Sequence, residues 1–357
     1  MAGCEDNCDD YMESAEERRN QPKGRGNDGI FYGFREERKM IRLLFSSAGR
    51  RVELINCFRQ AARELKADLQ VVAIDMDPLW SPACQVADHA YKVPQCTSPD
   101  FLDAVLDICK RHEVNLIIPT IDTELIGYAE NRDRFLADGT KIHLSSDDVI
   151  RVTRDKEETA RVLNDRGIPV PHTWNMKDDH NLKFPLLIKP RDGSCSNGIA
   201  IVNSWDELAR KNVDRDLYVA QEICQGREFT LNCFYDRLKG CVACVPHFRK
   251  FVRDGEVCFA ETVRIPEFKV IADKLYEIFP GIHGCICFQG FQDDSGHVSV
   301  FEINARFGGG YPICDRAGGT FAKWILQDLC GQAPDYHDNW HEGTRMLRYD
   351  AAVFIEK

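Results

Sequence analysis

The spacing of apolar runs changes once along this chain, near residue 150, and this change constrains the fold more than any other feature. Up to residue 150, short apolar runs alternate with amphipathic stretches, in the order "IRLLF", "VELINCFRQAAREL", "LQVVAIDMD", "PDFLDAVLDICKRH", "VNLIIPT" and "KIHLSS". Such alternation predicts an α/β domain with an open, largely parallel sheet covered by helices. Beyond residue 150, strand-like runs follow one another directly, which predicts antiparallel sheets and a second architecture.

The second region begins with a strongly helical segment, "SSDDVIRVTRDKEETARVLNDRG", which Gly167 and "IPVP" are expected to end. Its strand-like runs are "FPLLIKPRDGSCSNGIAIV", "LYVAQEICQGREFTLNCFY", "GCVACVPHF" and, after a helix around 267–279, "CICFQGFQDDSGHVSVFEINARF". "RMLRYDAAVFIEK" is expected to add a closing strand. We therefore predict domains at 41–150 and 151–357, preceded by a tail at 1–40.

The tail is polar, charged and Gly-rich without a helical or strand period, so we expect it to be disordered, and Met40 is a candidate natural start. The net charge of −11 argues against binding to nucleic acid or to an anionic membrane. We find neither a signal peptide nor an apolar run of the ~18 residues that a membrane helix needs. The sixteen cysteines are scattered through apolar runs, so we expect reduced core thiols and a cytoplasmic protein.

Two alternative sites are less well supported. A zinc site on Cys241 and Cys244, with Cys233 and Cys258 as further ligands, would have to form within a run that is typical of a buried strand. A nicotinamide or flavin site would need G-x-G-x-x-G after the first strand, where this chain has one glycine and two arginines. Ligands of open parallel sheets bind at the carboxyl ends of strands, which here are 46–51, 75–77 and 120–124.

A predicted hairpin near the end of the chain brings polar side chains onto one face. A loop at 294–297, with Asp293 opposite Val298, would place Gln289 directly opposite Glu302. Side chains alternate along a strand, so the next residues of "EINAR" that share the face of the glutamate are the asparagine and the arginine. Carboxylate and amide oxygens suit Mg²⁺, and the arginine could contact a transferring phosphoryl group. The alternatives are a solvated strand face and a one-residue register slip that separates the pair.

Two segments upstream could bind a nucleotide. In "LLIKPRDGSCSNG" an apolar strand ends at Lys189, and Gly193 and Gly198 bracket a loop that could fold over phosphates. It is not a P-loop, because Ile199 and Ala200 stand where that motif needs Lys and Ser or Thr. In "YVAQEICQGREF" a strand end could offer backbone groups to adenine and a carboxylate to ribose.

Taken in this order, the segments resemble the ATP-grasp superfamily, and most of all its carbamoyl-phosphate synthase large-chain-like branch, which includes amino-acid ligases such as the one in pyrrolysine biosynthesis. The resemblance covers about 41–355 and is most specific in "EINARFGGGYP" and "IKPRDGSCSNG". The first region, with "FSSAGRRV" and "IIPTIDTEL", resembles the domain that precedes the ATP-grasp lobes. The resemblance implies an α+β ATP-grasp fold of two lobes with antiparallel sheets, in which about 155–222 cover the phosphates.

The resemblance also implies roles for individual residues. The residues implied to contact the nucleotide are Lys156 and Lys189 at the phosphates, Ser194, Ser196 and Gly198 in the flap, Glu222 at the adenine hinge and Glu228 at the ribose. The implied magnesium ligands are Gln289, Glu302 and Asn304, and Arg306 would face the γ-phosphate. Many relatives have Asp or Glu where Gln289 stands, and an amide is the weaker ligand.

The implied reaction is ATP-dependent ligation of a carboxylate to an amine through an acyl phosphate, with one or two Mg²⁺ ions for which Mn²⁺ could substitute. The partners would be small molecules, and a homodimer is left open. Candidates for holding a substrate carboxylate are Arg249, Arg253 and Arg264, and 47–51 and 122–124 could bind the other substrate. The alternatives are a phosphotransferase that makes acyl or carbamoyl phosphate, and a nucleotide-binding regulatory protein without chemistry.

Overall fold

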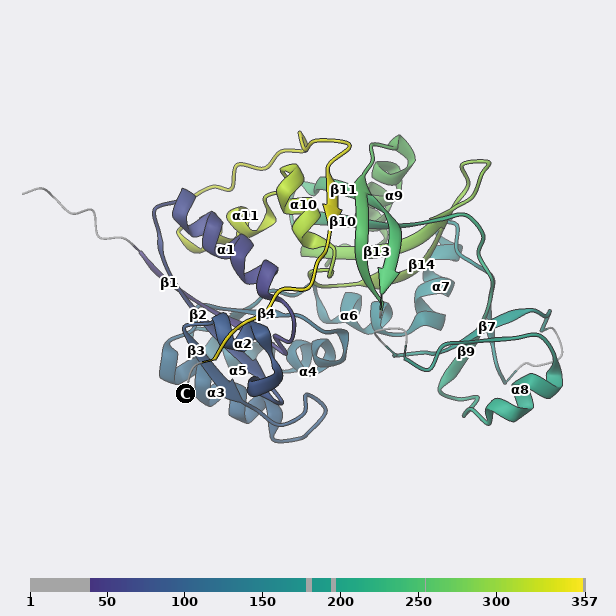
Figure 1. Ribbon diagram of the computed structural model, residues 1–357, viewed down its shortest axis with the longest axis horizontal. Coiled ribbons are helices and arrows are strands. Elements are labelled where there is room, and N and C mark those ends of the chain that lie inside the picture. The colour runs from purple at the N-terminus through teal and green to yellow at the C-terminus, as the bar shows by residue number, and fades with distance from the viewer. Residues whose placement is uncertain (1–38, 178–181, 194–196, 254, 356–357) are drawn as a thin grey trace, which may run out of the picture. The chain divides into compact units, whose positions relative to one another are not determined.

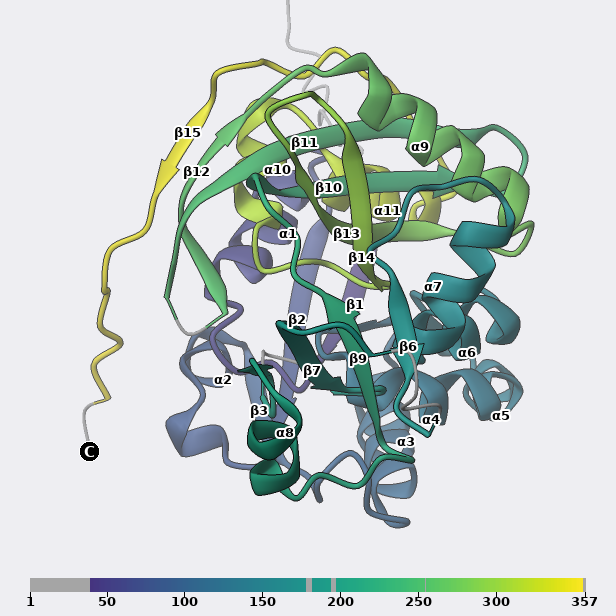
Figure 2. The same cartoon turned by 90° about the vertical axis from the view of Figure 1, so that its right-hand side faces the viewer.

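The computed structural model describes residues 39–177, 182–193, 197–253 and 255–355 (Figures 1 and 2). The tail predicted to be disordered lies almost wholly outside the described residues. The described part contains three β-sheets, one of five strands, one of six and one of four. Within the described ranges, no helix combines the length and the apolar character needed to cross a membrane.

The first sheet is parallel, as predicted, with the strand order β3-β2-β1-β4-β5. Its strands are β1 (Met40–Ser46), β2 (Asp68–Asp75), β3 (His89–Lys92), β4 (Leu116–Pro119) and β5 (Lys141–Ile142). The sequence did not reveal β3, a four-residue edge strand. Both faces of the central strands are buried: Leu43 and Phe45 of β1 pack with helix α1, whereas Leu44 packs with α3 on the opposite side.

Helices of this region are short except for the two that cover the sheet. They are α1 (Val52–Glu64), α2 (Pro82–Val86), α3 (Phe101–His112), α4 (Leu125–Glu130) and α5 (Arg132–Ala137), with single 3₁₀ turns at Pro78–Trp80 and Asp122–Glu124. The second turn follows β4 at the carboxyl edge of the sheet. The predicted rim therefore exists, and it faces the rest of the described unit through Asp122.

Two antiparallel sheets form the second region, again as predicted. The larger one has the order β14-β13-β10-β11-β12-β15 and the smaller one β6-β9-β7-β8. The larger sheet comprises β10 (Arg227–Asp236), β11 (Gly240–Arg253), β12 (Glu256–Thr262), β13 (Gly284–Gln292), β14 (Val298–Asn304) and β15 (Arg345–Leu347). The smaller sheet comprises β6 (Thr173–Asn175), β7 (Leu186–Pro190), β8 (Ala200–Val202) and β9 (Tyr218–Glu222). The predicted closing strand is β15, three residues long and paired with β12 (Figure 2).

The helical segment expected as one helix after residue 145 is in fact two, α6 (Asp147–Arg154) and α7 (Lys156–Asp165). Asp155 between them is extended, with φ −102° and ψ 112°, and its side chain accepts the N–H groups of Glu157 and Glu158. An aspartate that caps a new helix in this way ends the preceding one. The remaining helices are α8 (Trp205–Lys211), α9 (Pro266–Ile278), α10 (Tyr311–Ala317) and α11 (Phe321–Leu329).

The hairpin of β13 and β14 has the predicted pair but not the predicted turn. Gln289 lies opposite Glu302, whereas Val298 pairs with Gln292 and not with Asp293. A β-bulge next to Gly290 takes up the one-residue difference. Glycine is required there, because a Cβ at that position would lie 2.3 Å from the carbonyl oxygen of Ser299.

The cysteines within the described ranges are free thiols, and most are buried. Cys233 lies opposite Cys244 in the β10–β11 pair, and burial raises the pKa of Cys233 well above its usual value. Neutral thiols are poor metal ligands. Among the described residues, no group of three or more His, Cys, Asp or Glu side chains is placed to hold a metal ion, so the zinc alternative gains no support.

Candidate functional site

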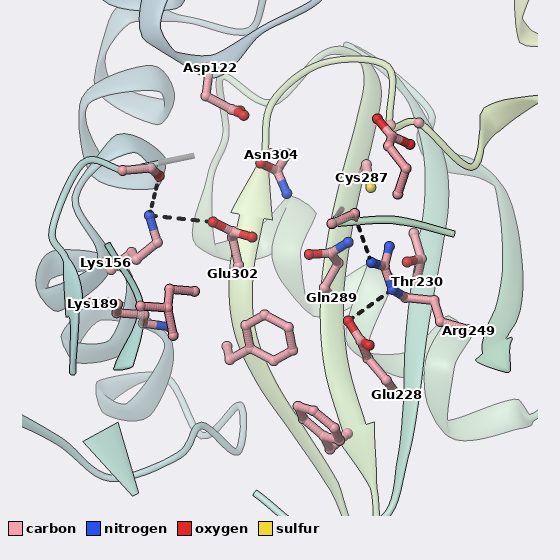
Figure 3. A pocket seen from close by; sticks show the side chains of 18 of the residues that line it. Asp122, Lys156, Lys189, Glu228, Thr230, Arg249, Cys287, Gln289, Glu302 and Asn304 are labelled. Atoms are coloured by element: carbon pink, nitrogen blue, oxygen red, sulfur yellow. Dashed lines mark hydrogen bonds and ion pairs between the residues drawn. The ribbon is translucent and has the colours of Figure 1, made fainter. Parts of the chain in front are cut away.

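A cleft of about 310 Å³ lies between the small sheet and one face of the large sheet. This volume is in the range of small-molecule sites. Residues from both sheets, from the start of α7 and from the rim of the first sheet line it. The predicted site residues that line it are Lys156, Lys189, Glu222, Glu228, Arg249, Gln289, Glu302, Asn304 and Arg306. Segments as distant along the chain as those of Asp122 and Asn304 therefore meet in one site (Figure 3).

Two lysines form the cationic wall of the cleft. Lys156 is the first residue of α7, and its Nζ donates to the carbonyl of Gly193 (2.6 Å) and lies 3.4 Å from Oε1 of Glu302. Lys189 lies in β7 and donates to Oε1 of Gln221 (2.9 Å), and its side chain is only 3% exposed. Burial lowers the pKa of Lys189 to about 8, although Glu302 opposes this shift.

The opposite wall is the hairpin predicted from the sequence. Glu302 and Asn304, two residues apart on β14, both line the cleft and therefore share a face (Figure 3). The hydrogen-bond network orients the Gln289 amide so that its nitrogen donates to Oε2 of Glu302 (3.1 Å) and its oxygen accepts from Nη1 of Arg249 (2.9 Å). In this arrangement Gln289 positions the Glu302 carboxylate.

Arg249 connects the hairpin to Glu228. Its Nε lies 2.9 Å from Oε1 of Glu228, and its Nη2 donates to the carbonyl of Gly255 (3.0 Å). Burial raises the pKa of Glu228, and Arg249 opposes that rise. Thr230, in the next strand position that faces the cleft, has a buried hydroxyl for which the described residues offer no hydrogen-bond partner. A ligand group in the cleft could satisfy this hydroxyl.

Arg306 forms an ion pair with Asp122, which lies at the carboxyl edge of the first sheet. Its guanidinium donates to Oδ2 of Asp122, to the carbonyl of Phe307 (2.9 Å) and to Oδ1 of Asn304 (3.3 Å). Burial by itself lowers the pKa of Arg306, but Asp122 and the nearby Cys287 and Glu302 together outweigh burial and raise it, so the group stays charged. The side chain of Asp122 is only 4% exposed.

The rim residues that we expected to bind a substrate have a different use. Glu124 is buried and accepts hydrogen bonds from the hydroxyls of Ser46 (2.6 Å) and Ser47 (2.7 Å) and from the N–H of Thr120 (2.8 Å). Asp75 likewise accepts the N–H of Gly49 (2.8 Å). These carboxylates fix the loops after β1 and β4, so within 47–51 and 122–124 only Arg51 and Asp122 line the cleft.

Two of the three arginines predicted to hold a substrate carboxylate do not line the cleft. Arg253 contacts Asp350 (2.6 Å), and Arg264 lies over the ring of Trp340, 3.9 Å from its centre. Gly198 does not line the cleft either; it has φ +74° in the turn before β8, where a Cβ would lie 2.8 Å from Oη of Tyr218. Ser194 and Ser196 lie outside the described residues.

Glu256, the first residue of β12, also lines the cleft, although no sequence pattern predicted it. Its carboxylate contacts Nη1 of Arg51 and Nη1 of Arg348, both at 3.2 Å. It also lies against Gly309, where a Cβ would be 1.9 Å from Oε2. No local pattern marks Glu256, because its partners come from the two ends of the folded region. The only available signal was the triple glycine, which indicates a close approach of some other group.

Comparison with known families and proteins agrees with this geometry. The family description "PylC-like, N-terminal domain" matches residues 43–143, and "ATP-grasp domain" matches residues 153–310. Among curated proteins, the chain is 23% identical over 168 residues to a D-alanine–D-alanine ligase of Fusobacterium nucleatum, covering 44% of this chain and 58% of the ligase. It is 26% identical over 201 residues to D-alanine–D-alanine ligase B of Pseudomonas putida, covering 49% and 63%. It thus spans about three-fifths of the length of these ligases.

Solved structures share the fold across most of the chain. The biotin carboxylase domain of the 2-oxoglutarate carboxylase of Hydrogenobacter thermophilus matches with a TM-score of 0.66 at 17% identity, covering 85% of this chain and 73% of that one. The N5-carboxyaminoimidazole ribonucleotide synthetase of Thermotoga maritima matches with a TM-score of 0.61 at 18% identity, covering 84% and 78%. At such identities the likeness shows the fold alone. The two family matches, the three sheets and the cleft between them lead to one conclusion: this chain contains a PylC-like N-terminal domain followed by an ATP-grasp domain.

Proposed function

We propose that this protein is an ATP- and Mg²⁺-dependent carboxylate–amine ligase that acts through an acyl phosphate. The observation that carries the proposal is the meeting of Lys156 and Glu302, 3.4 Å apart, inside the cleft. One belongs to a helix before the small sheet and the other to the far edge of the large sheet. Such a pairing of opposite charges across a cleft suits a ligand that brings both phosphates and a metal ion.

The nucleotide would lie between the two sheets. Lys156 and Lys189 would neutralise phosphate charge, while Leu187, Phe291 and Phe301 give the cleft apolar walls that suit a base. Glu222 ends β9 and lines the cleft, as a hinge residue at the adenine would. Glu228 would bind the ribose. Because Glu228 already contacts Arg249, a hydroxyl donor would join an existing ion pair.

The side chains on β14 fit a magnesium ion. Glu302 and Asn304 offer hard oxygen atoms, and a positive charge, the ammonium of Lys156, already stands next to the Glu302 carboxylate. Glu302 and Asn304 would hold the ion, and Gln289 would join them if its amide turned. The ion would neutralise charge on the phosphate oxygens, and Mn²⁺ could take its place.

Arg306 would stabilise the transferring phosphoryl group, because its guanidinium stays charged while buried. In the proposed reaction the γ-phosphoryl group passes to a carboxylate oxygen of one substrate and ADP leaves. The amine then attacks the acyl carbon, phosphate leaves, and a C–N bond forms. The thiols that line the cleft are poor nucleophiles, because burial raises the pKa of Cys224 to about 11 and that of Cys287 to about 12.

The assignment extends to the whole chain as follows. Residues 41–150 would form the domain that precedes the ATP-grasp lobes, and 151–357 the ATP-grasp domain, with about 155–222 covering the phosphates. The substrates would be a small-molecule carboxylate and a small-molecule amine, and a homodimer is compatible with this scheme. The free thiols of the described ranges favour a reducing compartment such as the cytoplasm.

The test is ADP release by the full chain with pools of amino acids and other carboxylic acids, followed by mass analysis of the products. We expect ADP release that depends on both an acid and an amine, and a condensed product. Glu302→Ala should abolish ADP release, while Glu261→Ala, which removes a half-buried ion-pair glutamate of β12 that does not line the cleft, should not. Unchanged turnover of Glu302→Ala, or ADP release without any condensed product, would contradict the proposal.

A further inference from the structure

Glu256 is bound in the way that proteins bind a carboxylate ligand. Each of its oxygens contacts a different guanidinium at 3.2 Å: Oε1 contacts Arg51 and Oε2 contacts Arg348. Two guanidiniums on one carboxylate form a strong, directional site. Arg51 follows β1 at the rim of the first sheet, whereas Arg348 follows β15, so the tertiary fold builds this site from three distant segments.

The surroundings of Glu256 hold more positive than negative charge. Arg51, Arg306 and Arg348 all act on its carboxylate, and together they outweigh burial, so the pKa of Glu256 is lowered. The other nearby carboxylate, Asp122, is already bound to Arg306. Burial and these neighbouring guanidiniums lower the pKa of Arg51, which shows how much its charge depends on a partner. Without an anion between them, Arg51 and Arg348 would be left poorly compensated.

This site opens into the cleft. Arg51 and Glu256 line the same cleft as Glu302 and Arg306, and Nη2 of Arg348 donates to the carbonyl of Gly309, which also lines it. Glu256 forms the last pair of the β11–β12 hairpin and its side chain is 27% exposed, so the carboxylate can turn away while the strand stays paired. A glutamate there offsets part of the positive charge of Arg51 and Arg348 as long as no other anion is bound.

We infer that Arg51 and Arg348 form a recognition site for a carboxylate group of a substrate, which binds there in exchange for the side chain of Glu256. The group that binds is a carboxylate that does not react, because the proposed metal ligand Glu302 contacts Lys156 and not Arg51 or Arg348. The inference rests on the proposed function only in identifying the ligand as a substrate. It then implies that one substrate carries a carboxylate in addition to its reacting group.

The decisive experiment uses sodium acetate as the probe and needs no enzymatic activity. Removal of the glutamate side chain by Glu256→Ala leaves a space of carboxylate size between two guanidiniums. We expect acetate, compared with chloride at equal ionic strength, to raise the thermal unfolding midpoint of Glu256→Ala by about 2 °C or more. The wild-type chain should not respond, because Glu256 occupies the site. The double variant that combines Glu256→Ala with Arg51→Met should not show this rise of the unfolding midpoint in acetate.

Glu261→Ala is the matched control, since Glu261 also lies on β12 and also contacts two cationic side chains, Lys250 and Arg345, at the surface. It should respond to acetate no more than to chloride. The inference would be overturned if acetate and chloride shifted the unfolding midpoint of Glu256→Ala equally. It would also be overturned if acetate shifted the midpoints of Glu256→Ala and of the double variant equally. Glu256→Ser provides a second version of the opened site. If the two variants can be recovered as folded protein in acetate but not in chloride, this result would also support the exchange. If neither variant can be recovered as folded protein in acetate or in chloride, the inference is overturned.

A kinetic arm separates this inference from the proposed function. Once an amino-acid substrate has been identified, it is compared with the amine that lacks the carboxylate. We expect Glu256→Ala to lower KM several-fold for the amino acid, since the competing side chain is gone, and to leave KM unchanged for the amine and for ATP. Equal changes for both substrates would contradict the exchange. If no ligase activity is found, the proposed function fails while the acetate measurement still decides the site.

Discussion

The Nζ atom of Lys156 lies 3.4 Å from Oε1 of Glu302, so a cation from the start of α7 neutralises the carboxylate that we propose as a metal ligand. Both side chains are mostly buried, with exposed fractions of 10% and 23%. Charge compensation at partly buried sites is worth more than at the surface, because solvent screens it less. The cleft therefore holds an internal cation next to the position of the proposed magnesium ion.

This pair predicts how Lys156→Met should respond to magnesium alone. Without the ammonium group, the Glu302 carboxylate is uncompensated and should bind Mg²⁺ more tightly in the absence of nucleotide. We expect MgCl₂ to raise the thermal unfolding midpoint of Lys156→Met more than that of the wild type. Adding Glu302→Gln to the variant should remove the difference. Equal midpoints for Lys156→Met and wild type in MgCl₂ would argue against a metal site at Glu302.

Lys189 predicts a pH dependence. Its pKa is lowered by burial from 10.5 to about 8, so the ammonium is present below pH 8 and is lost as the pH rises through that value. ATP affinity of the free enzyme, measured by calorimetry, should therefore weaken above pH 8. Lys189→Met should bind ATP weakly at every pH, with a flat profile between pH 7 and 9. A wild-type profile that is equally flat would exclude a phosphate contact.

The same shift has a consequence for stability. Because the folded-state pKa of Lys189 lies below the unfolded value, the unfolded chain binds more protons between pH 8 and pH 10.5. The free energy of unfolding contributed by this group therefore increases as the pH rises through that window. Urea titrations should show Lys189→Met stabilised relative to wild type at pH 7, with the gap narrowing at higher pH. A gap that does not narrow would contradict the lowered pKa.

Asp122 should affect turnover through Arg306. In Asp122→Asn the guanidinium loses its buried counter-charge but can keep a hydrogen bond, so Arg306 should be less well positioned. We expect kcat to fall about tenfold, equivalent to ~1.4 kcal/mol, with KM for ATP nearly unchanged. Asp138→Asn, which disrupts an exposed pair with Lys110 in the same region, is the control. A rise in KM with kcat unchanged would place Asp122 in substrate binding instead.

Gly290 should be intolerant of any side chain. A Cβ in Gly290→Ala would lie 2.3 Å from the carbonyl oxygen of Ser299 and 2.5 Å from the ring of Phe229. We expect a loss of ~1–3 kcal/mol in the free energy of unfolding and a loss of activity, because the bulge that aligns Gln289 with Glu302 is disturbed. Gly127→Ala in α4 is the comparison, since its Cβ would lie at an ordinary contact distance of 3.7 Å from the side chain of Leu102 in α3. Equal stabilities of the two variants would contradict this account.

Local sequence patterns were sufficient for the sheets and for one wall of the cleft. The strand–helix alternation before residue 150 predicted a parallel sheet, and the consecutive strands after it predicted antiparallel ones, because hydrophobic periodicity records which faces are buried. The spacing of Glu302 and Asn304 was enough to place them on one face. A turn, by contrast, depends on backbone hydrogen bonds that no hydrophobic periodicity records. The predicted partner of Val298 was therefore wrong by one residue: Val298 pairs with Gln292 and not with Asp293.

What the amino-acid order settled, then, is the type of each sheet, which follows from whether helices separate the strands, and the residues that one strand presents together, which follow from its two-residue period. What only the folded chain decided is which distant charges meet. Asp122 reaches Arg306, and Glu256 joins Arg51 to Arg348, across 184, 205 and 92 positions respectively. Such pairs form because packing brings buried charges to their nearest opposite charge, and nothing in the residues beside them announces the partner.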